Sequence, residues 1–247
     1  MTSICAGAPQ LLRYATDARE GDALMLLPDI KPGRALFLGN ALAILPFLMA
    51  SLFEVVVAAD WNASRLAFAR RRRDEEEVAN LTCIPADAVE DLTRREGRFD
   101  VVVLGEESPE WHTSLPLDGP WTLARLSSLL VAGGCLVYGV RFRLVDVFVQ
   151  RLASSRKRRV PTFYPAHARL LATAMLTPAA VYWRRPDLRP YQVHVPLDPP
   201  IVGYWLEQAP LARGARQRLN TVLTTAASRA GLLHRLVDNF LVIARRP

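Results

Sequence analysis

Residues 34–60 decide the fold of this chain, and they read RALFLGNALAILPFLMASLFEVVVAAD. The stretch begins and ends with short runs of β-prone apolar residues, 34–38 and 54–59. Between these runs the chain turns at Gly39, and a segment with helical character then extends to Leu52. A strand, a helix and a second strand in this order form the βαβ unit of a parallel sheet. The stretch therefore predicts an α/β fold.

The alternation of strands and helices continues along the rest of the chain. We expect further strands at 81–84, 99–104, 135–140, 179–183 and 239–244, and helices at 62–78, 121–131, 144–152, 165–176 and 212–230. The last two strands are expected to pair as an antiparallel edge. The pattern predicts a Rossmann-like, mostly parallel seven-stranded sheet with helices on both faces and a helical C-terminal insertion.

The length of the chain suits one domain. Its 247 residues are 51% hydrophobic, which is enough to form one sizeable core. We divide it into an N-terminal helical segment, 1–33, a core of 34–183 and 239–247, and an insertion, 184–238. The insertion is too small for a core of its own. We interpret it either as a lid or as the interface of a homodimer.

Charge bears on the binding partners of the protein, and cysteine content bears on its location. The net charge of +7 rests mainly on arginine, because Lys31 and Lys157 are the only lysines. The basic run at 156–159 has no accompanying set of aromatic residues, so we expect a solvated loop there and no nucleic-acid partner. The three cysteines are widely spaced, which indicates reduced thiols and a cytoplasmic location.

The uncharged run at 35–53 must also be weighed as a membrane segment. Its 19 residues are nominally long enough to span a bilayer. However, Gly39, Asn40 and Pro46 divide the run into a strand-like and a helix-like piece, and no other candidate span follows. The N-terminus lacks the basic start and apolar core of a secretion signal. We therefore expect neither export nor integral membrane association.

Ligands of an open α/β sheet bind beyond the carboxyl ends of its strands. The residues at these ends are Gly39, Asn40, Asp60, Trp61, Asp87, Ala88 and Gly105. Asp60 lies 21 residues after Gly39, a spacing at which a carboxylate accepts hydrogen bonds from the ribose hydroxyls of an adenosine cofactor. Asp60 is equally suited to cap the helix that begins near Asn62. Both roles remain open, and one residue can serve both.

Five short motifs occur in a defined order: Leu36-Phe-Leu-Gly39, Val57-Ala-Ala-Asp60, Ile84-Pro-Ala-Asp87, Phe99-Asp-Val-Val-Val-Leu104 and Leu129-Leu-Val-Ala-Gly-Gly134. Their order and intervals resemble those of class I S-adenosylmethionine-dependent methyltransferases over residues 30–142. The resemblance implies S-adenosyl-L-methionine as cofactor. It also implies that Asp60 holds the ribose, that Asp87 approaches the adenine amino group, and that Gly39 begins the loop beneath the methionine end.

Two features depart from the family's pattern. Phe37 stands where the family usually has an acid two residues before its first glycine, and the glycine-rich loop reads Gly39-Asn-Ala-Leu-Ala43, with a single glycine. An acid there would form a charge-assisted hydrogen bond with the methionine ammonium, which contributes about 1.5–3 kcal/mol. Alanine also resists positive φ by roughly 1 kcal/mol or more. We therefore expect the adenosine contacts to be retained and the methionine contacts to be weakened.

The loop after the fourth expected strand contains the candidate catalytic residues. Glu106 and His112 lie there on the substrate side of the sheet, and His112 is the candidate base, with a solvated loop histidine as the alternative. The resemblance implies a methyltransferase with a small-molecule acceptor, in a setting such as bacterial specialised biosynthesis. The competing hypothesis is a methyltransferase-like protein that does not methylate, either a binding or regulatory subunit or a fold used for another ligand.

Overall fold

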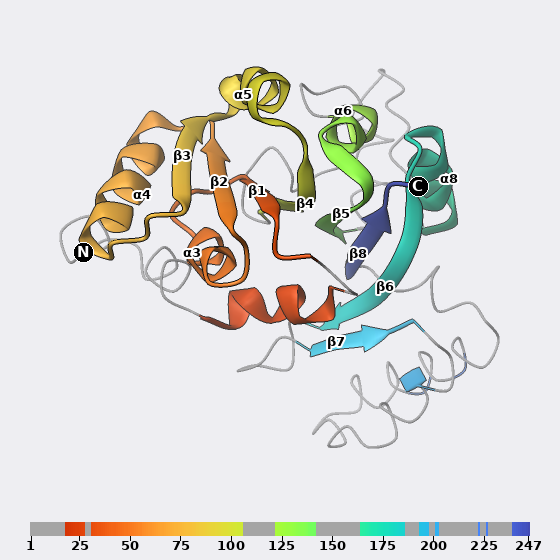
Figure 1. Ribbon diagram of the computed structural model, residues 1–247. Helices are drawn as coiled ribbons and strands as arrows, with labels where there is room; N and C mark the ends of the chain where they lie inside the picture. The colour runs from red at the N-terminus through yellow and green to blue at the C-terminus, as the bar shows by residue number, and fades with distance from the viewer. Residues whose placement is uncertain are drawn as a thin grey trace, which may run out of the picture.

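The strands of the protein form a single sheet (Figure 1). The computed structural model describes residues 18–27, 31–105, 122–141, 164–185, 193–197, 201–202, 222, 226 and 239–247. Within these ranges, eight strands lie in the order β3-β2-β1-β4-β5-β8-β6-β7. Their bounds are β1 Arg34–Leu38, β2 Val55–Asp60, β3 Leu81–Pro85, β4 Phe99–Leu104, β5 Leu130–Arg141, β6 Thr177–Arg185, β7 Val193–Pro196 and β8 Asn239–Arg245.

The directions of the strands confirm a Rossmann-like, mostly parallel α/β fold. Strands β3, β2, β1, β4 and β5 run parallel to their neighbours. The predicted antiparallel pairing of the last two expected strands is also confirmed, because β8 pairs with β6. Strand β8 pairs with β5 on its other side, so it lies within the sheet and not at its edge.

The sheet has eight strands where the sequence predicted seven. The additional strand, β7, falls inside the expected insertion at 184–238 and pairs with β6 along the far edge of the sheet. Val195 of this strand is 2% exposed and joins the core. The proline-rich character of the surrounding sequence concealed a short strand in which Val193 and Val195 alternate with polar or proline residues.

Helices flank the sheet on both faces. Their bounds are α3 Leu45–Ala50, α4 Ala63–Glu75, α5 Val89–Glu96, α6 Leu123–Ser128 and α8 Tyr164–Thr173, with 3-10 helices η1 Ala18–Leu26 and η2 Ala86–Ala88. The uncharged run at 35–53 becomes β1, a loop and α3, as its glycine and proline indicated. None of the helices in the described part of the chain is long and apolar enough to cross a membrane.

One helix is shorter than predicted. The sequence suggested a helix over 121–131, but α6 ends at Ser128 and β5 begins at Leu130. Leu130 pairs with Phe99 of β4, and the register then shifts so that Val101 pairs with Cys135. Gly133, with φ of 80°, lies within this irregularity and supplies a conformation that side chains resist. The predicted helix at 144–152 and most of that at 212–230 lie outside the described residues.

Alternate side chains of β1 divide the core into two layers. Leu36 and Leu38 pack on the face covered by α5, α6 and α8. Ala35 and Phe37 pack on the opposite face, with apolar side chains of η1, α3 and α4. The alternation follows from the two-residue period of a strand that is buried on both sides. The central strand thereby fixes the position of the loop that follows it.

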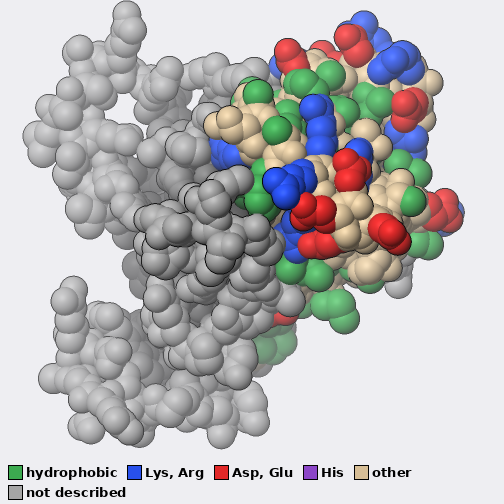
Figure 2. Space-filling model, turned by 90° about the vertical axis from the view of Figure 1, so that its left-hand side faces the viewer, with side chains coloured by type: hydrophobic (Ala, Val, Ile, Leu, Met, Phe, Trp, Pro, Cys, Tyr) green, Lys and Arg blue, Asp and Glu red, His purple; other side chains and the backbone are tan. Residues whose placement is uncertain are grey.

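The surface over α4 carries charges of both signs. Figure 2 shows the face that carries this helix, where Lys and Arg side chains are interspersed with Asp and Glu. Arg71 pairs with Glu75 (Nε to Oε1, 2.7 Å), and Arg73 pairs with Asp74 (Nη2 to Oδ1, 2.6 Å). The charges of these two arginines are therefore offset locally.

Two of the cysteines are buried free thiols. Cys83 of β3 and Cys135 of β5 form no disulfide. Burial raises the pKa of the Cys83 thiol above its ordinary value. Both residues are therefore core side chains, as their apolar sequence surroundings suggested.

Candidate functional site

The carboxyl ends of β2, β1 and β4 meet at one edge of the sheet. Leu38, the last residue of β1, pairs with Ala59 of β2 and with Leu104 of β4. The backbone continues this pairing beyond the strands, because Gly39 N donates to Ala59 O at 3.0 Å and Gly105 N donates to Leu38 O at 2.9 Å. The loops after β1 and β4 therefore begin in direct contact.

Gly39 occupies a position at which any residue with a Cβ would be strained. Its φ of 148° is a conformation that residues with a Cβ rarely adopt. A Cβ at this position would also lie 3.1 Å from Gly105 Cα and 3.2 Å from Gly105 N. The single glycine that this loop retains is therefore required by backbone conformation and by the close approach of the neighbouring loop.

Phe37 fills the position at which the resembling family has an acid. Its side chain is 0% exposed and belongs to the core layer beneath α3 and α4. The ring also reaches the start of the neighbouring loop, since a Cβ on Gly105 would lie 2.7 Å from Phe37 Cζ. An aromatic ring packed in this way supplies no negative charge for a ligand ammonium.

Four of the backbone donors in the loop after β1 are bonded within the protein. Gly39 N bonds to Ala59 O, and Ala43 N donates to Asn40 O at 3.0 Å. Ala41 N donates to Asp60 Oδ2 at 2.9 Å, and Leu42 N donates to Asn40 Oδ1 at 3.1 Å. In a ligand-binding glycine loop such N–H groups point at the ligand. Here these four are already bonded within the protein.

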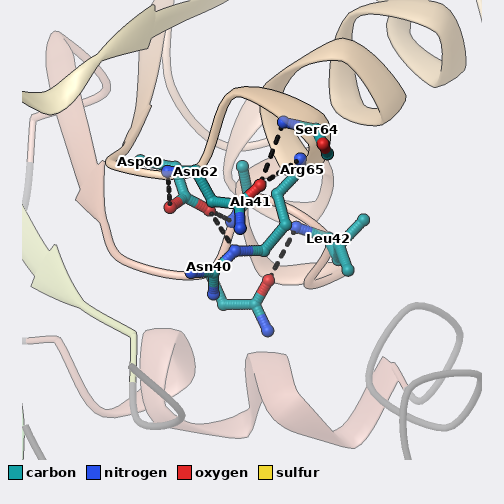
Figure 3. Close-up of polar contacts among 7 residues, drawn as sticks. All are labelled: Asn40, Ala41, Leu42, Asp60, Asn62, Ser64 and Arg65. Carbon is teal, nitrogen blue, oxygen red and sulfur yellow. Dashed lines mark hydrogen bonds and ion pairs between the residues drawn. The ribbon is translucent and has the colours of Figure 1, made fainter. Parts of the chain in front are cut away.

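Asp60 lies at the centre of this polar network, which we call the Asp60 network (Figure 3). Its side chain is 0% exposed. Oδ2 accepts from Ala41 N and lies 3.2 Å from Arg65 Nε, while Oδ1 accepts from Asn62 N at 2.9 Å. The carboxylate therefore ties the loop after β1 to the beginning of α4.

Asn62, and not Asp60, is the N-cap residue of α4. Its Oδ1 accepts from Ser64 N at 2.9 Å and from Arg65 N at 3.1 Å. These bonds satisfy two of the backbone donors that a helix leaves unpaired at its start. Asp60 supports the cap by accepting from the N–H of the cap residue itself. Of the two roles considered for Asp60, a structural role at the helix start is therefore present.

Asn62→Ala is expected to lower the free energy of unfolding by about 1 kcal/mol, because the first turn of α4 loses its side-chain acceptor. Urea unfolding followed by circular dichroism measures the change. Asn62→Ser keeps an oxygen at the cap and is expected to retain most of the stability. Equal losses in the two variants would contradict a capping role.

The residues beyond β2 and β3 form the more open part of the edge. Asp60 pairs with Pro85, which ends β3, and Asp87 follows on η2 with an exposed side chain. Trp61, directly after β2, is 39% exposed. An exposed indole and an exposed carboxylate at adjacent strand ends can receive a flat ring that carries an amino group.

Helix α5, which follows η2, is joined to α6 by a pair of charged side chains. Arg125 Nε of α6 donates to Glu90 Oε1 of α5. This hydrogen bond lowers the pKa of the Glu90 carboxyl below its ordinary value. Because both side chains are partly exposed, the pair adds little stability, of the order of 1 kcal/mol or less.

The structure brings together four of the residues expected at the strand ends, Gly39, Asn40, Asp60 and Gly105. Trp61, Asp87 and the half-buried Ala88 lie along the same edge. The two candidate catalytic residues, Glu106 and His112, lie outside the described residues.

Sequence reasoning missed Arg65, the side chain that contacts Asp60. A signal was present, because Arg65 lies in the first turn of α4, where a cation is unfavourable beside the positive end of the helix dipole. A cation at such a position indicates that an anion lies nearby.

No protein-family model and no curated protein matches the sequence. Solved structures do resemble the protein. A geranyl diphosphate methyltransferase in complex with S-adenosylmethionine has a TM-score of 0.51 at 16% identity, over 99% of this chain and 94% of that one. A geranyl diphosphate C-methyltransferase from Streptomyces coelicolor A3(2) has a TM-score of 0.50 at 14% identity, over 99% and 88%. YJHP from E. coli has a TM-score of 0.50 at 14% identity, over 98% and 96%.

These identities are low, so the likeness concerns the arrangement of strands and helices over nearly the whole chain. It agrees with the strand order and with the motifs that the sequence presents in β1 to β5. The chain has the Rossmann-like fold of the S-adenosylmethionine-dependent methyltransferases.

Proposed function

We propose that the protein is an S-adenosylmethionine-dependent methyltransferase with a small-molecule acceptor. The observation that carries this proposal is the arrangement beyond β2 and β3. Asp60 ends β2, the exposed Trp61 follows it, and the exposed Asp87 lies on the turn after the adjacent strand. In a sheet of this type, ligands bind beyond the carboxyl ends of the strands, and a carboxylate at such an end can accept from the ribose of a nucleotide cofactor.

The nucleoside half of the cofactor fits these residues. The ring of Trp61 would stack on the adenine, and the Asp87 carboxylate would accept from its amino group. Asp60 would accept from the ribose hydroxyls. When bound, the cofactor would supply an activated methyl group, and the acceptor would need a base only if it is protonated. Glu106 and His112 are the proposed residues for that proton.

The methionine half finds no matching partners among the residues that the structure describes beneath it. The ring of Phe37 replaces an acid, and four of the loop N–H groups are bonded within the protein. Binding is therefore proposed to depend mainly on the adenosine.

Accordingly, S-adenosylhomocysteine and 5′-methylthioadenosine are expected to bind with affinities within about threefold of each other in calorimetry. A charge-assisted contact to the amino-acid group would instead favour S-adenosylhomocysteine about 10-fold to 100-fold. A preference of that size would mean that other residues hold the methionine end. Absence of heat with both ligands at millimolar concentration, in a folded sample, would contradict the proposed function.

A second candidate is a methyltransferase-like protein that does not methylate. The burial of Phe37 and the bonded state of Asp60 favour it, because they leave two usual contacts of the cofactor unavailable. Native mass spectrometry of the purified protein separates the candidates. A nucleoside cofactor that remains bound through purification counts against the second one.

Two finer statements accompany the main proposal. The geranyl diphosphate methyltransferases among the similar structures are named for a small organic substrate, which supports a small-molecule acceptor and a setting such as bacterial specialised biosynthesis. The free thiols of Cys83 and Cys135 support a cytoplasmic location.

A further inference from the structure

We propose that Arg65 sets the affinity of this site for a nucleoside, because its guanidinium competes with the ribose for the carboxylate of Asp60. The inference rests on the proposed function and adds a residue and a physical step to it. Arg65 Nε lies 3.2 Å from Asp60 Oδ2, the oxygen that also accepts from Ala41 N. A ligand that uses Asp60 must therefore displace a charge that is already paired with it.

The surroundings of Asp60 leave no place for two ribose hydroxyls. A carboxylate offers about four lone-pair positions. Backbone N–H groups take one position on each oxygen, and Arg65 Nε forms an ion pair with Oδ2 at 3.2 Å without the geometry of a hydrogen bond. The carboxylate is 0% exposed in this arrangement. The three partners leave at most one position, on Oδ1, so both ribose hydroxyls can be received only after a partner has moved away from Oδ2.

Of the three partners, Arg65 is the one that can leave without disturbing the backbone. Ala41 N belongs to the loop that continues β1, and Asn62 N belongs to the cap residue of α4. Both positions are fixed by the sheet and the helix. Arg65 contributes to Asp60 only through a long side chain, which is 20% exposed and can turn into water about its own bonds.

The competition lowers the apparent affinity of the site. A ligand binds through Asp60 only in molecules whose Arg65 side chain has moved away from the carboxylate. The apparent dissociation constant rises as the fraction of such molecules falls. Removal of the guanidinium makes the binding-competent state the common one. It therefore increases affinity, whereas removal of a residue that contacts the ligand decreases it.

Arg65→Ala is expected to bind adenosine about tenfold more tightly than the unchanged protein, equivalent to about 1.4 kcal/mol. The dissociation constants are measured by calorimetry or by ligand-observed NMR. Arg71→Ala is the matched control, since Arg71 lies on the same helix, pairs with Glu75 on the surface, and its loss changes the net charge equally. It is expected to leave the affinity unchanged. Arg65→Gln provides the same test if the alanine variant does not fold.

A second ligand identifies the contact involved. 2′,3′-Dideoxyadenosine lacks both ribose hydroxyls, so Arg65→Ala is expected not to improve its binding. An equal gain for both nucleosides would overturn the inference, because the gain would not pass through Asp60. If the unchanged protein binds adenosine and both Arg65 variants bind it equally well or more weakly, the inference is overturned and the proposed function is not. Absence of binding to all of these proteins would overturn the proposed function, and the inference with it.

Discussion

Replacement of Asp60 by alanine is expected to lower the free energy of unfolding by about 3 kcal/mol or more. The variant removes the acceptor of Ala41 N and of Asn62 N, and it leaves the guanidinium of Arg65 without its counterion. The Ala41 N–H group and the carboxylate that accepts from it are both buried, so the N–H group that loses its acceptor has little access to water. Urea unfolding followed by circular dichroism gives the change.

Asp91→Ala is the control for this prediction. Asp91 pairs with Arg94 on the surface of α5, and the two side chains are 68% and 74% exposed. An exposed pair of this kind contributes about 0–1 kcal/mol. If the Asp60 variant loses no more stability than the Asp91 variant, the Asp60 network does not hold the loop after β1 to α4.

Replacement of Phe37 by alanine is expected to cost about 3–5 kcal/mol, through lost burial and the cavity that remains. The side chain is 0% exposed and lies in the core layer that α3 and α4 cover. Its ring also lies against the backbone of Gly105, so the start of the loop after β4 loses its support. The same unfolding measurement applies, with the midpoint and slope determined separately.

Two variants at the same position make this test specific. Phe37→Leu keeps much of the apolar volume and is expected to lose clearly less stability than the alanine variant. Phe37→Asp restores the type of residue that the resembling family usually has here. It is expected to unfold the protein and not to create a site for an ammonium, because the charge would be buried without a partner. A folded Phe37→Asp variant with full stability would contradict the packing described for this ring.

The strands were the most predictable part of the structure. β1 and β4 have the bounds that their sequences predict, since a strand buried on both faces is a continuous apolar run with clear ends. The boundary between α6 and β5 was predicted wrongly, because an apolar run near Leu130 suits a helix or a strand equally. Pairing with Phe99, a distant residue, decides between them.

The candidate site was predictable in position but not in its internal bonding. The rule that ligands bind beyond strand ends located Gly39 and Asp60 correctly at one edge of the sheet. It could not reveal that the carboxylate of Asp60 already has three partners, because their arrangement depends on how α4 and the preceding loop pack. The position of Arg65 in the first turn of α4 indicates a nearby anion, but only the structure shows that this anion is Asp60.

The position of β8 has a consequence for the order in which the sheet assembles. Among strands β1 to β5 the widest pairing in sequence joins β1 to β4, with Ala35 opposite Val101, whereas β5 and β8 pair across a much longer stretch of chain. β6 is joined to these strands only through β8, because β8 pairs with β6 on one side and with β5 on the other. The pairing of β8 with β5 places Asn239 opposite Arg141. Pairing of β5 with β8 closes the long segment between these two residues, and such closure has an entropic cost. Attachment of the far edge is therefore expected to be the late step of folding, with β8 as the strand that completes it.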